Sequence, residues 1–329
     1  MANLEEIAKA AGVSVSTASR ALHNDTRISL DTRLKVEETA EHLGYTKHKI
    51  KGIKMQKWNT AGLIVPEVLS GYYARLVHVA NDFFEKQNYS TILKLTNFDQ
   101  DTMIRDIYDF GWMDVKCLLI LLDDSEEISN DIFSAISAIK RPAMFITAKY
   151  FSNLDFDSLF LDERRGMAMG IEHLIQRGYR RIGFLAEDKT MGRLRVFQEL
   201  MQSYGMPVES RFIKTSQERA EEGGYLCMRE ILAESEHPDA VFASYDQMAI
   251  GAIKAIEEAG LSIPNDIAML GFDDMIVSKY ISKGLTTIHN QYEDMMSIAV
   301  RVLLNRVENS NSSPQQIALK PSLIIRGTT

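Results

Sequence analysis

Residues 7–22 have the sequence IAKAAGVSVSTASRAL, and this stretch decides how the first part of the chain folds. Apolar residues between Leu4 and Ala11 recur with the spacing of one face of an amphipathic helix. Gly12 interrupts that helix, and Ser14 is a suitable N-cap for a second helix from about Val15 to Leu22. The stretch therefore predicts two short helices joined by a tight glycine-containing turn, which is a helix-turn-helix.

A third helix is expected to open at Ser29 and to end at Gly44. Its apolar face would consist of Val36, Ala40 and Leu43, which pack against the first two helices. Residues 1–45 are therefore predicted to form a small all-α headpiece.

Residues 46–60 are polar and rich in lysine, and we interpret them as a hinge or linker. Residues 1–60 carry 10 basic and 7 acidic side chains, whereas the rest of the chain carries 27 and 38. Gly44–Thr60 alone contains five lysines and no acid. A basic end on an acidic body is typical of a module that meets nucleic-acid phosphates while the remainder avoids them.

The longer part, residues 61–329, alternates short apolar runs with amphipathic helical stretches such as Tyr73–Glu85, Met167–Arg177 and Met248–Ala259. This alternation predicts parallel sheets built from strand–helix–strand units, and the number of strands favours two doubly wound subdomains in an α/β body. The expected strands are Ala61–Val65, Thr91–Leu95, Lys116–Leu122, Ala143–Thr147, Ser158–Leu161, Arg181–Leu185, Ala240–Ala243 and Ile267–Leu270.

Several function classes find no support in the sequence. There is no GxGxxG after a strand, no phosphate-binding GxxxxGKS/T and no GxSxG, and the seven histidines lack metal-ligand spacing. We therefore expect neither an enzyme, a cofactor nor a metal site. Without an export signal or an apolar run of about 18 residues, and with two widely separated cysteines, a cytoplasmic protein without a membrane partner is expected.

Residues 7–22 resemble the pattern IAxxAGVSxxTVSRVL of the LacI/GalR family of bacterial repressors. The similarity continues through the whole chain, in Ser29–Arg33, Gly62–Pro66, Ser244–Gly251, Gly271–Asp274 and Ile325–Thr328 among other segments. The resemblance implies a periplasmic-binding-protein-like body with a ligand cleft between two halves that the chain crosses three times. The halves would be an N-subdomain of about 61–159 and 291–317, and a C-subdomain of about 160–290 and 318–329.

The second helix carries the side chains that suit DNA recognition. By resemblance, Val15, Ser16 and Arg20 contact base edges, and an arginine can bond O6 and N7 of guanine together. Thr17 and Ser19 are better placed to hold phosphates. The complete predicted DNA-binding set is Leu4, Ser14, Val15, Ser16, Thr17, Ser19, Arg20, Asn24, Ile53 and Met55.

The linker departs from the family pattern. Relatives usually have a hinge helix that inserts an apolar side chain into the minor groove, which bends the duplex. Here the segment is KHKIKGIKM at residues 47–55, with Ile53 as the candidate wedge, Met55 as the second candidate and a helix-weakening Gly52. A linker that inserts no side chain is the alternative.

The predicted effector contacts combine strand ends with the resemblance. Asp246 and Asp273 follow strands, where open α/β sheets bind ligands, although helix capping or loop hydrogen bonding would also explain them. Three positions depart from sugar-binding relatives: Thr147, Tyr245 and Arg219. The predicted effector-binding set is Tyr72, Tyr73, Thr147, Arg195, Arg219, Tyr245, Asp246 and Asp273.

The sequence thus predicts a DNA-binding repressor of carbohydrate-utilisation genes, controlled by a sugar or sugar phosphate. A phosphate is suggested because Arg195 and Arg219 could both face an anion. With no leucine-heptad helix after the final strand, a homodimer on a pseudo-palindromic operator is expected. The alternatives are a sugar-binding protein without DNA function, and an activator.

Overall fold

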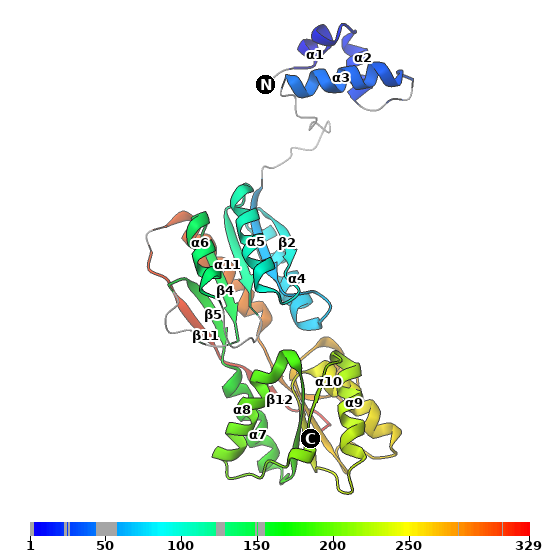
Figure 1. Cartoon of the computed structure of the whole chain (residues 1–329), viewed down its shortest axis with the longest axis vertical. Helices are drawn as coiled ribbons and strands as arrows, with labels where there is room; N and C mark the ends of the chain where they lie inside the picture. The colour runs from blue at the N-terminus through cyan, green and yellow to red at the C-terminus, as the bar shows by residue number, and fades with distance from the viewer. Residues whose placement is uncertain are drawn as a thin grey trace. The chain divides into compact units, whose positions relative to one another are not determined.

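A computed structural model of the chain describes residues 3–22, 25, 27–43, 58–122, 129–148, 150, 155–281, 283–310 and 312–329. The chain divides into two compact units, Met1–Lys57 and Trp58–Thr329 (Figure 1). Among the described residues, no helix combines the length and the apolar composition that crossing a membrane requires.

The first unit is the predicted three-helix headpiece, with α1 at Leu4–Ala11, α2 at Val15–Leu22 and α3 at Leu30–His42. Asn3 and Glu6 form a capping box at the start of α1, and Gly12 ends that helix with a φ of 70°. The Ser14 hydroxyl accepts from the Thr17 amide at 3.1 Å and so caps α2. The predicted helix-turn-helix is confirmed.

A small apolar core holds the headpiece together. The prediction that Leu43 belongs to this core is wrong, because its side chain is 40% exposed. The core residues are Ile7, Ala8, Ala11, Ala18, Ala21, Leu22, Val36 and Ala40. Their small average size lets three short helices approach closely.

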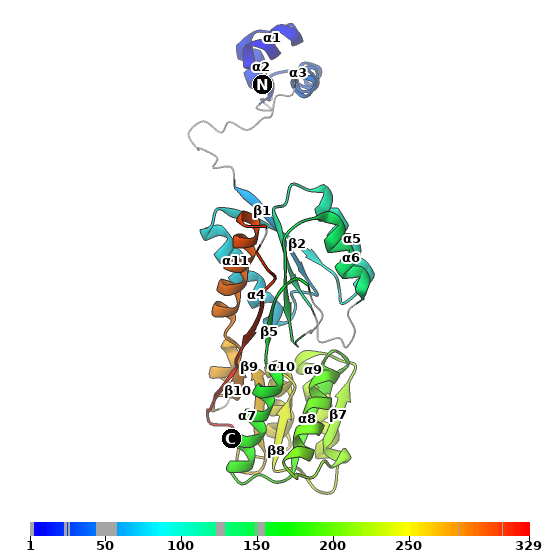
Figure 2. The same ribbon diagram turned by 90° about the vertical axis from the view of Figure 1, so that its left-hand side faces the viewer.

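The second unit, hereafter the body, contains two six-stranded sheets, and the first of these is parallel throughout. Helices α4 (Gly71–Lys86) and α11 (Tyr292–Glu308) cover one face of it, and α5 (Gln100–Trp112) and α6 (Asn130–Ile139) cover the other (Figure 2). We call this half the N-half. Its strand order is β11 (Gln316–Leu319), β5 (Asp157–Leu161), β4 (Ala143–Thr147), β3 (Cys117–Leu121), β1 (Asn59–Val65) and β2 (Tyr89–Leu95).

The second sheet has the same winding, and we call its half the C-half. Helices α7 (Glu163–Gln176) and α8 (Met191–Ser203) cover one face, and α9 (Ala220–Leu232) and α10 (Asp246–Glu258) cover the other. Its strands pair in parallel, as the sequence predicted, except at one edge, where β12 runs antiparallel to β10. The strand order is β12 (Ser322–Ile324), β10 (Thr286–His289), β9 (Ala268–Asp273), β8 (Ala240–Ala243), β6 (Ile182–Glu187) and β7 (Ile213–Ser216).

The central strands are apolar because both of their faces are covered. In β1, Leu63 and Val65 pack towards α4 and α11, whereas Ile64 packs towards α5 and α6. All eight predicted strands are present. Four others, β7, β10, β11 and β12, were not among the predicted runs, because they are short and contain polar or half-buried residues.

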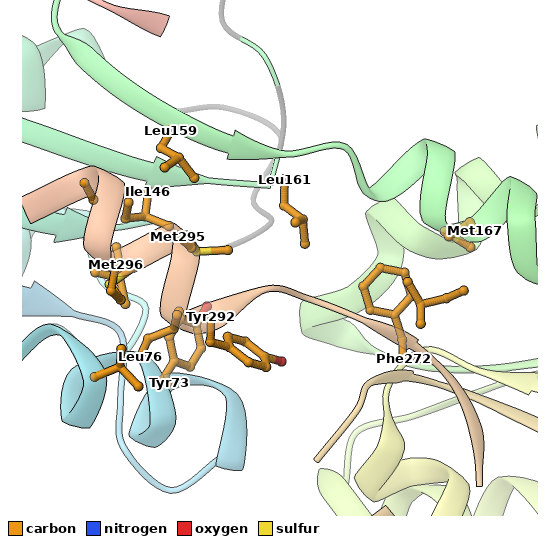
Figure 3. Packing of buried hydrophobic residues seen from close by; sticks show 14 of the residues in the cluster. Tyr73, Leu76, Ile146, Leu159, Leu161, Met167, Phe272, Tyr292, Met295 and Met296 are labelled. Carbon is orange, nitrogen blue, oxygen red and sulfur yellow. The ribbon is translucent and has the colours of Figure 1, made fainter. Parts of the chain in front are cut away.

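Three connections join the two halves: β5 to α7, β10 to α11, and β11 to β12. The fully buried Tyr292 lies on the second of them, at the start of α11. Figure 3 shows it beside Tyr73 and Leu76 of α4, with Phe272 and Met167 of the C-half further along the same apolar cluster. The core of the body is therefore continuous across the junction between the halves.

Helices α9 and α10 cross so closely that only glycine fits at the crossing. A Cβ on Gly251 would lie 1.8 Å from the Glu221 carbonyl oxygen, and one on Gly224 would lie 1.9 Å from that of Met248. The Gly251→Ala variant should therefore lose about 1–3 kcal/mol in the free energy of unfolding, because the backbones must separate.

Urea unfolding of the purified chain measures this loss. Gly111→Ala in α5 is the matched control, because its Cβ would meet only the movable side chain of Ile139 and should cost less. Equal stability of the Gly251→Ala variant and the parent would contradict the close crossing.

Candidate functional sites

The exposed face of α2 is the candidate nucleic-acid surface. Ala18, Ala21 and Leu22 point into the headpiece core, which leaves Ser16 and Arg20 exposed to solvent on the opposite face. Val15 is also exposed, to 44%. The face thus offers an apolar contact, a hydroxyl and a guanidinium, the groups that distinguish base edges in the major groove.

The other predicted DNA-binding residues have different environments. The Ser14 hydroxyl lies 2.9 Å from that of Ser16 and 2.8 Å from that of Thr17, so the start of α2 is a cluster of hydroxyls. Thr17 and Ser19 are half-buried, and Leu4 packs against the headpiece core. Asn24, Ile53 and Met55 lie outside the described residues.

A cavity of about 80 Å³ lies at the junction of the two halves of the body. Several polar lining residues end a strand or follow one within three residues: Glu163, Glu187, Lys189, Thr190, Arg219, Tyr245 and Asp273. Both sheets are doubly wound, and in such sheets ligands bind beyond the carboxyl ends of the strands, where the strand order reverses. The lining residues are Ser70, Tyr72, Tyr73, Phe98, Leu122, Ala148, Glu163, Glu187, Lys189, Thr190, Arg193, Arg219, Tyr245, Gln247 and Asp273.

Asp273 occupies a strained position in this cavity. Its φ is 108°, a conformation that side-chain-bearing residues rarely adopt, and neighbouring structure holds it there. Asn290 donates to its carboxylate at 3.0 Å, and the Tyr292 hydroxyl donates to its carbonyl at 2.8 Å. Burial raises the pKa of Asp273 well above its usual range, although Arg193 opposes the effect.

Arg193 is fixed by several partners at once. Its guanidinium forms a two-point ion pair with Glu163 and donates to the Ser244 carbonyl at 2.6 Å. It also lies 4.2 Å from the centre of the Phe272 ring and 3.9 Å from Asp273. Such a two-point pair positions the side chain rigidly.

A second network surrounds Glu187, which is 1% exposed. It accepts from the Tyr245 hydroxyl at 2.5 Å and from Arg219 Nε at 3.1 Å. Arg219 Nη2 also lies 3.7 Å from Glu67 of the N-half, so this guanidinium bridges carboxylates from both halves. Burial and the adjacent Glu187 raise the pKa of Tyr245, which keeps its hydroxyl protonated.

The structure brings together five of the eight predicted effector contacts: Tyr72, Tyr73, Arg219, Tyr245 and Asp273 line the cavity. Thr147 is buried at the end of β4, immediately before the lining residue Ala148. Arg195 is on the exposed side of α8 instead, because two residues along a helix rotate the side chain by about 200°. Arg193 takes the place in the cavity that was predicted for Arg195.

Asp246 also lies outside the cavity lining. It is fully buried and accepts hydrogen bonds from the Met275 amide, the Ser278 hydroxyl and the Thr287 hydroxyl. These bonds tie the start of α10 to the segments after β9 and in β10. Its surroundings match the alternative of loop hydrogen bonding that the sequence left open.

Sequence reasoning missed several lining residues. Glu187 ends β6, so the rule that ligands meet strand ends would have found it. Glu163 and Lys189 follow strands closely in the same way. Phe98 gives no such signal, because it follows β2 in a turn where its φ is 63°.

Known proteins resemble this chain in both the headpiece and the body. A family model of bacterial regulatory proteins of the lacI family matches residues 3–48, and a model of the periplasmic binding protein-like domain matches residues 171–329. Two curated relatives are each 29% identical over 334 residues. The first is the HTH-type transcriptional repressor PurR of Haemophilus influenzae (strain PittEE), for which the alignment covers 99% of this chain and 98% of the relative. The second is the ribose operon repressor of Escherichia coli (strain K12), for which the alignment covers all of both chains. Among solved structures, the lac repressor dimer bound to operator and the anti-inducer ONPF has a TM-score of 0.73 at 23% identity, covering 99% of this chain and 98% of that one.

The buried Asp246 should make stability depend on pH. Burial raises the pKa of Asp246 from 3.8 to about 7, although the three hydrogen bonds that its carboxylate accepts act to lower this pKa. The folded protein therefore keeps a proton that the unfolded chain releases. The free energy of unfolding should fall as pH rises from about 4 to about 7, by up to about 1.4 kcal/mol per pH unit, and Asp273 contributes with the same sign.

Urea unfolding at several pH values tests this dependence. Asp246→Asn should flatten it, because an amide does not titrate. The amide oxygen can still accept from the Met275 amide and the Ser278 hydroxyl, and the amide NH2 can donate to the Thr287 hydroxyl. Asp266→Asn is the control, because hydrogen bonds from Ser262 lower the pKa of that exposed carboxyl and its removal should leave the fall in place. Parallel curves for the parent and Asp246→Asn would refute the assignment.

Proposed function

Because the chain belongs to the LacI family of bacterial regulatory proteins, we propose that it is a transcriptional repressor that a small carbohydrate-like effector controls. The observation that carries the proposal is the pairing of a capped recognition helix with a charged cavity between two sheets. Its relatives are repressors and not enzymes. The headpiece match argues against a sugar-binding protein without DNA function.

The headpiece contacts the operator through α2. Arg20 supplies a donor pair for guanine, Ser16 a hydroxyl and Val15 an apolar contact, for example to a thymine methyl group. Ser14 and Thr17 lie at the start of the helix, where backbone amides favour phosphate, and Ser19 lies two residues further along. The protein acts where its operator is, in the cytoplasm.

The body senses the effector in the cavity between its halves. One relative is a ribose operon repressor, which supports a carbohydrate as the effector. Residues from the N-half, such as Tyr72 and Tyr73, and from the C-half, such as Arg193 and Asp273, line the same space. A ligand held by both halves changes their relative orientation, and a coupling of about 1–3 kcal/mol to the DNA-bound state is enough for regulation.

We also propose a homodimer, which matches a pseudo-palindromic operator. An exposed apolar surface lies where the start of α4 meets η3 (Ile276–Lys279). Ile276 and Tyr280 are 66% and 78% exposed there, and Leu69, two residues before α4, is 89% exposed. Large contiguous apolar patches mark interaction sites. The lac repressor of similar fold is a dimer.

Replacing Arg20 tests the proposed function. Arg20→Ala should reduce discrimination between the preferred duplex, selected from a random pool, and a scrambled one by about 1–3 kcal/mol, because a base contact is lost. Lys35→Ala on α3 is the control, and should weaken binding to both duplexes equally if at all. Unchanged discrimination by Arg20→Ala in a salt-controlled titration would overturn the assignment of α2.

A charge within the apolar surface tests the assembly. Ile276→Asp should shift the body from dimer to monomer in sedimentation velocity, because a carboxylate would have to be buried. Trp112→Ser serves as the control, because that side chain is 92% exposed on α5 and should not alter the assembly. A dimer of unchanged strength in Ile276→Asp would place the interface elsewhere.

A further inference from the structure

We infer that the effector is an uncharged polyhydroxy compound, and that the carboxylates of the cavity exclude its phosphorylated form. The inference rests on the proposed function, in which this cavity is the effector site. It concerns the charge of the ligand, which neither the family nor the fold determines. The inference follows from the three cations that line the cavity, Arg193, Arg219 and Lys189, and from the groups that each of them contacts.

The charge of the first guanidinium, that of Arg193, is already balanced by the carboxylate of Glu163. Glu163 takes two of its donors and the Ser244 carbonyl takes a third. Both members of the ion pair are about nine-tenths buried. A phosphate that recruited Arg193 would leave Glu163 as a buried, unpaired carboxylate, which is strongly unfavourable.

The second guanidinium, that of Arg219, is shared between two carboxylates. Glu187 holds Nε at 3.1 Å, and Glu67 lies 3.7 Å from Nη2. These acids are 1% and 4% exposed, and the guanidinium also lies 5.1 Å from the centre of the Phe98 ring. Arg219 therefore balances charge that the protein has already buried.

The remaining cation does not reverse the balance. Lys189 is exposed, and its ammonium lies 4.9 Å from the centre of the same Phe98 ring. Against the three cations stand the carboxyl groups of Glu163, Glu187 and Asp273 in the lining, with Glu67 directly behind. Even with Asp273 protonated, the cavity carries no net positive charge.

The groups that remain for a ligand are suited to hydroxyls. The carboxylate oxygens of the lining, such as those of Glu187, accept hydrogen bonds, and a sugar hydroxyl can donate to them. A phosphate brings about two negative charges and only strong acceptors, so it would oppose the same groups. Tyr72 and Tyr73 add aromatic faces on which the apolar face of a sugar ring can rest.

The first experiment uses inorganic sulfate as the probe, so that it does not require the effector to be known. Sulfate raises the melting temperature of most proteins by exclusion from their surface, so the parent is compared with Arg219→Gln. The expected result is the same rise in both chains and a larger rise in Glu187→Gln, where Arg219 loses its closest carboxylate. A larger rise in the parent than in Arg219→Gln would overturn the inference.

The second experiment uses the parent alone and so does not depend on the folding of variants. Calorimetry compares D-ribose with D-ribose 5-phosphate and D-glucose with D-glucose 6-phosphate. The uncharged member of any pair that binds should bind at least about 10-fold more tightly, and tighter binding of a phosphate would overturn the inference.

The same preparation is tested for sequence-specific DNA binding, so that failure of the inference about ligand charge can be distinguished from failure of the proposed function. Tighter binding of a phosphate with DNA binding intact would remove only the inference about charge. Absence of sequence-specific DNA binding would instead remove the proposed function.

Discussion

Both sheets of the body point the carboxyl ends of their strands at the junction between the halves, and the candidate effector site depends on this constraint. Each parallel strand ends in a loop at the same edge of its sheet, so polar residues from many parts of the chain converge there. Glu187 and Asp273 end β6 and β9, and Tyr245 follows β8 by two residues. The matching edge of the N-half contributes Leu122 and Ala148.

Convergence of this kind buries charge, and buried charge must be paired. The body meets this requirement with two linked ion-pair networks, one at Arg193 and one at Arg219. The second network includes Glu67 and therefore crosses the junction. Electrostatics thus joins the two halves at the place where a ligand would sit, so ligand chemistry and the relative orientation of the halves are physically connected.

The two units divide the chemistry of the chain between them. The headpiece has a small core and presents hydroxyls, an exposed valine and an arginine on a single helix face. The body is acidic overall and buries much of its charge. This separation allows a polyanion to bind at one end while a small molecule is recognised at another by groups that would repel it.

The sequence by itself determined the features that depend on residues close together along the chain. The Ser14 cap and the break at Gly12 predicted the first two headpiece helices, and the apolar runs predicted eight of the twelve strands in the described part of the chain, because helix capping and burial on both faces leave direct patterns. Short strands such as β7 left no such pattern, since their residues are only half-buried.

Tertiary structure alone decided which side chains share the cavity. Two residues of α8 separate Arg193, inside the cavity, from Arg195, exposed to solvent, and only the rotation of the packed helix distinguishes them. Asp246 follows β8 and Glu187 ends β6, yet local hydrogen bonds occupy Asp246, whereas Glu187 lines the cavity. Which side chains line the cavity depends on contacts between segments that are distant in sequence. The spacing of residues along the chain does not specify these contacts.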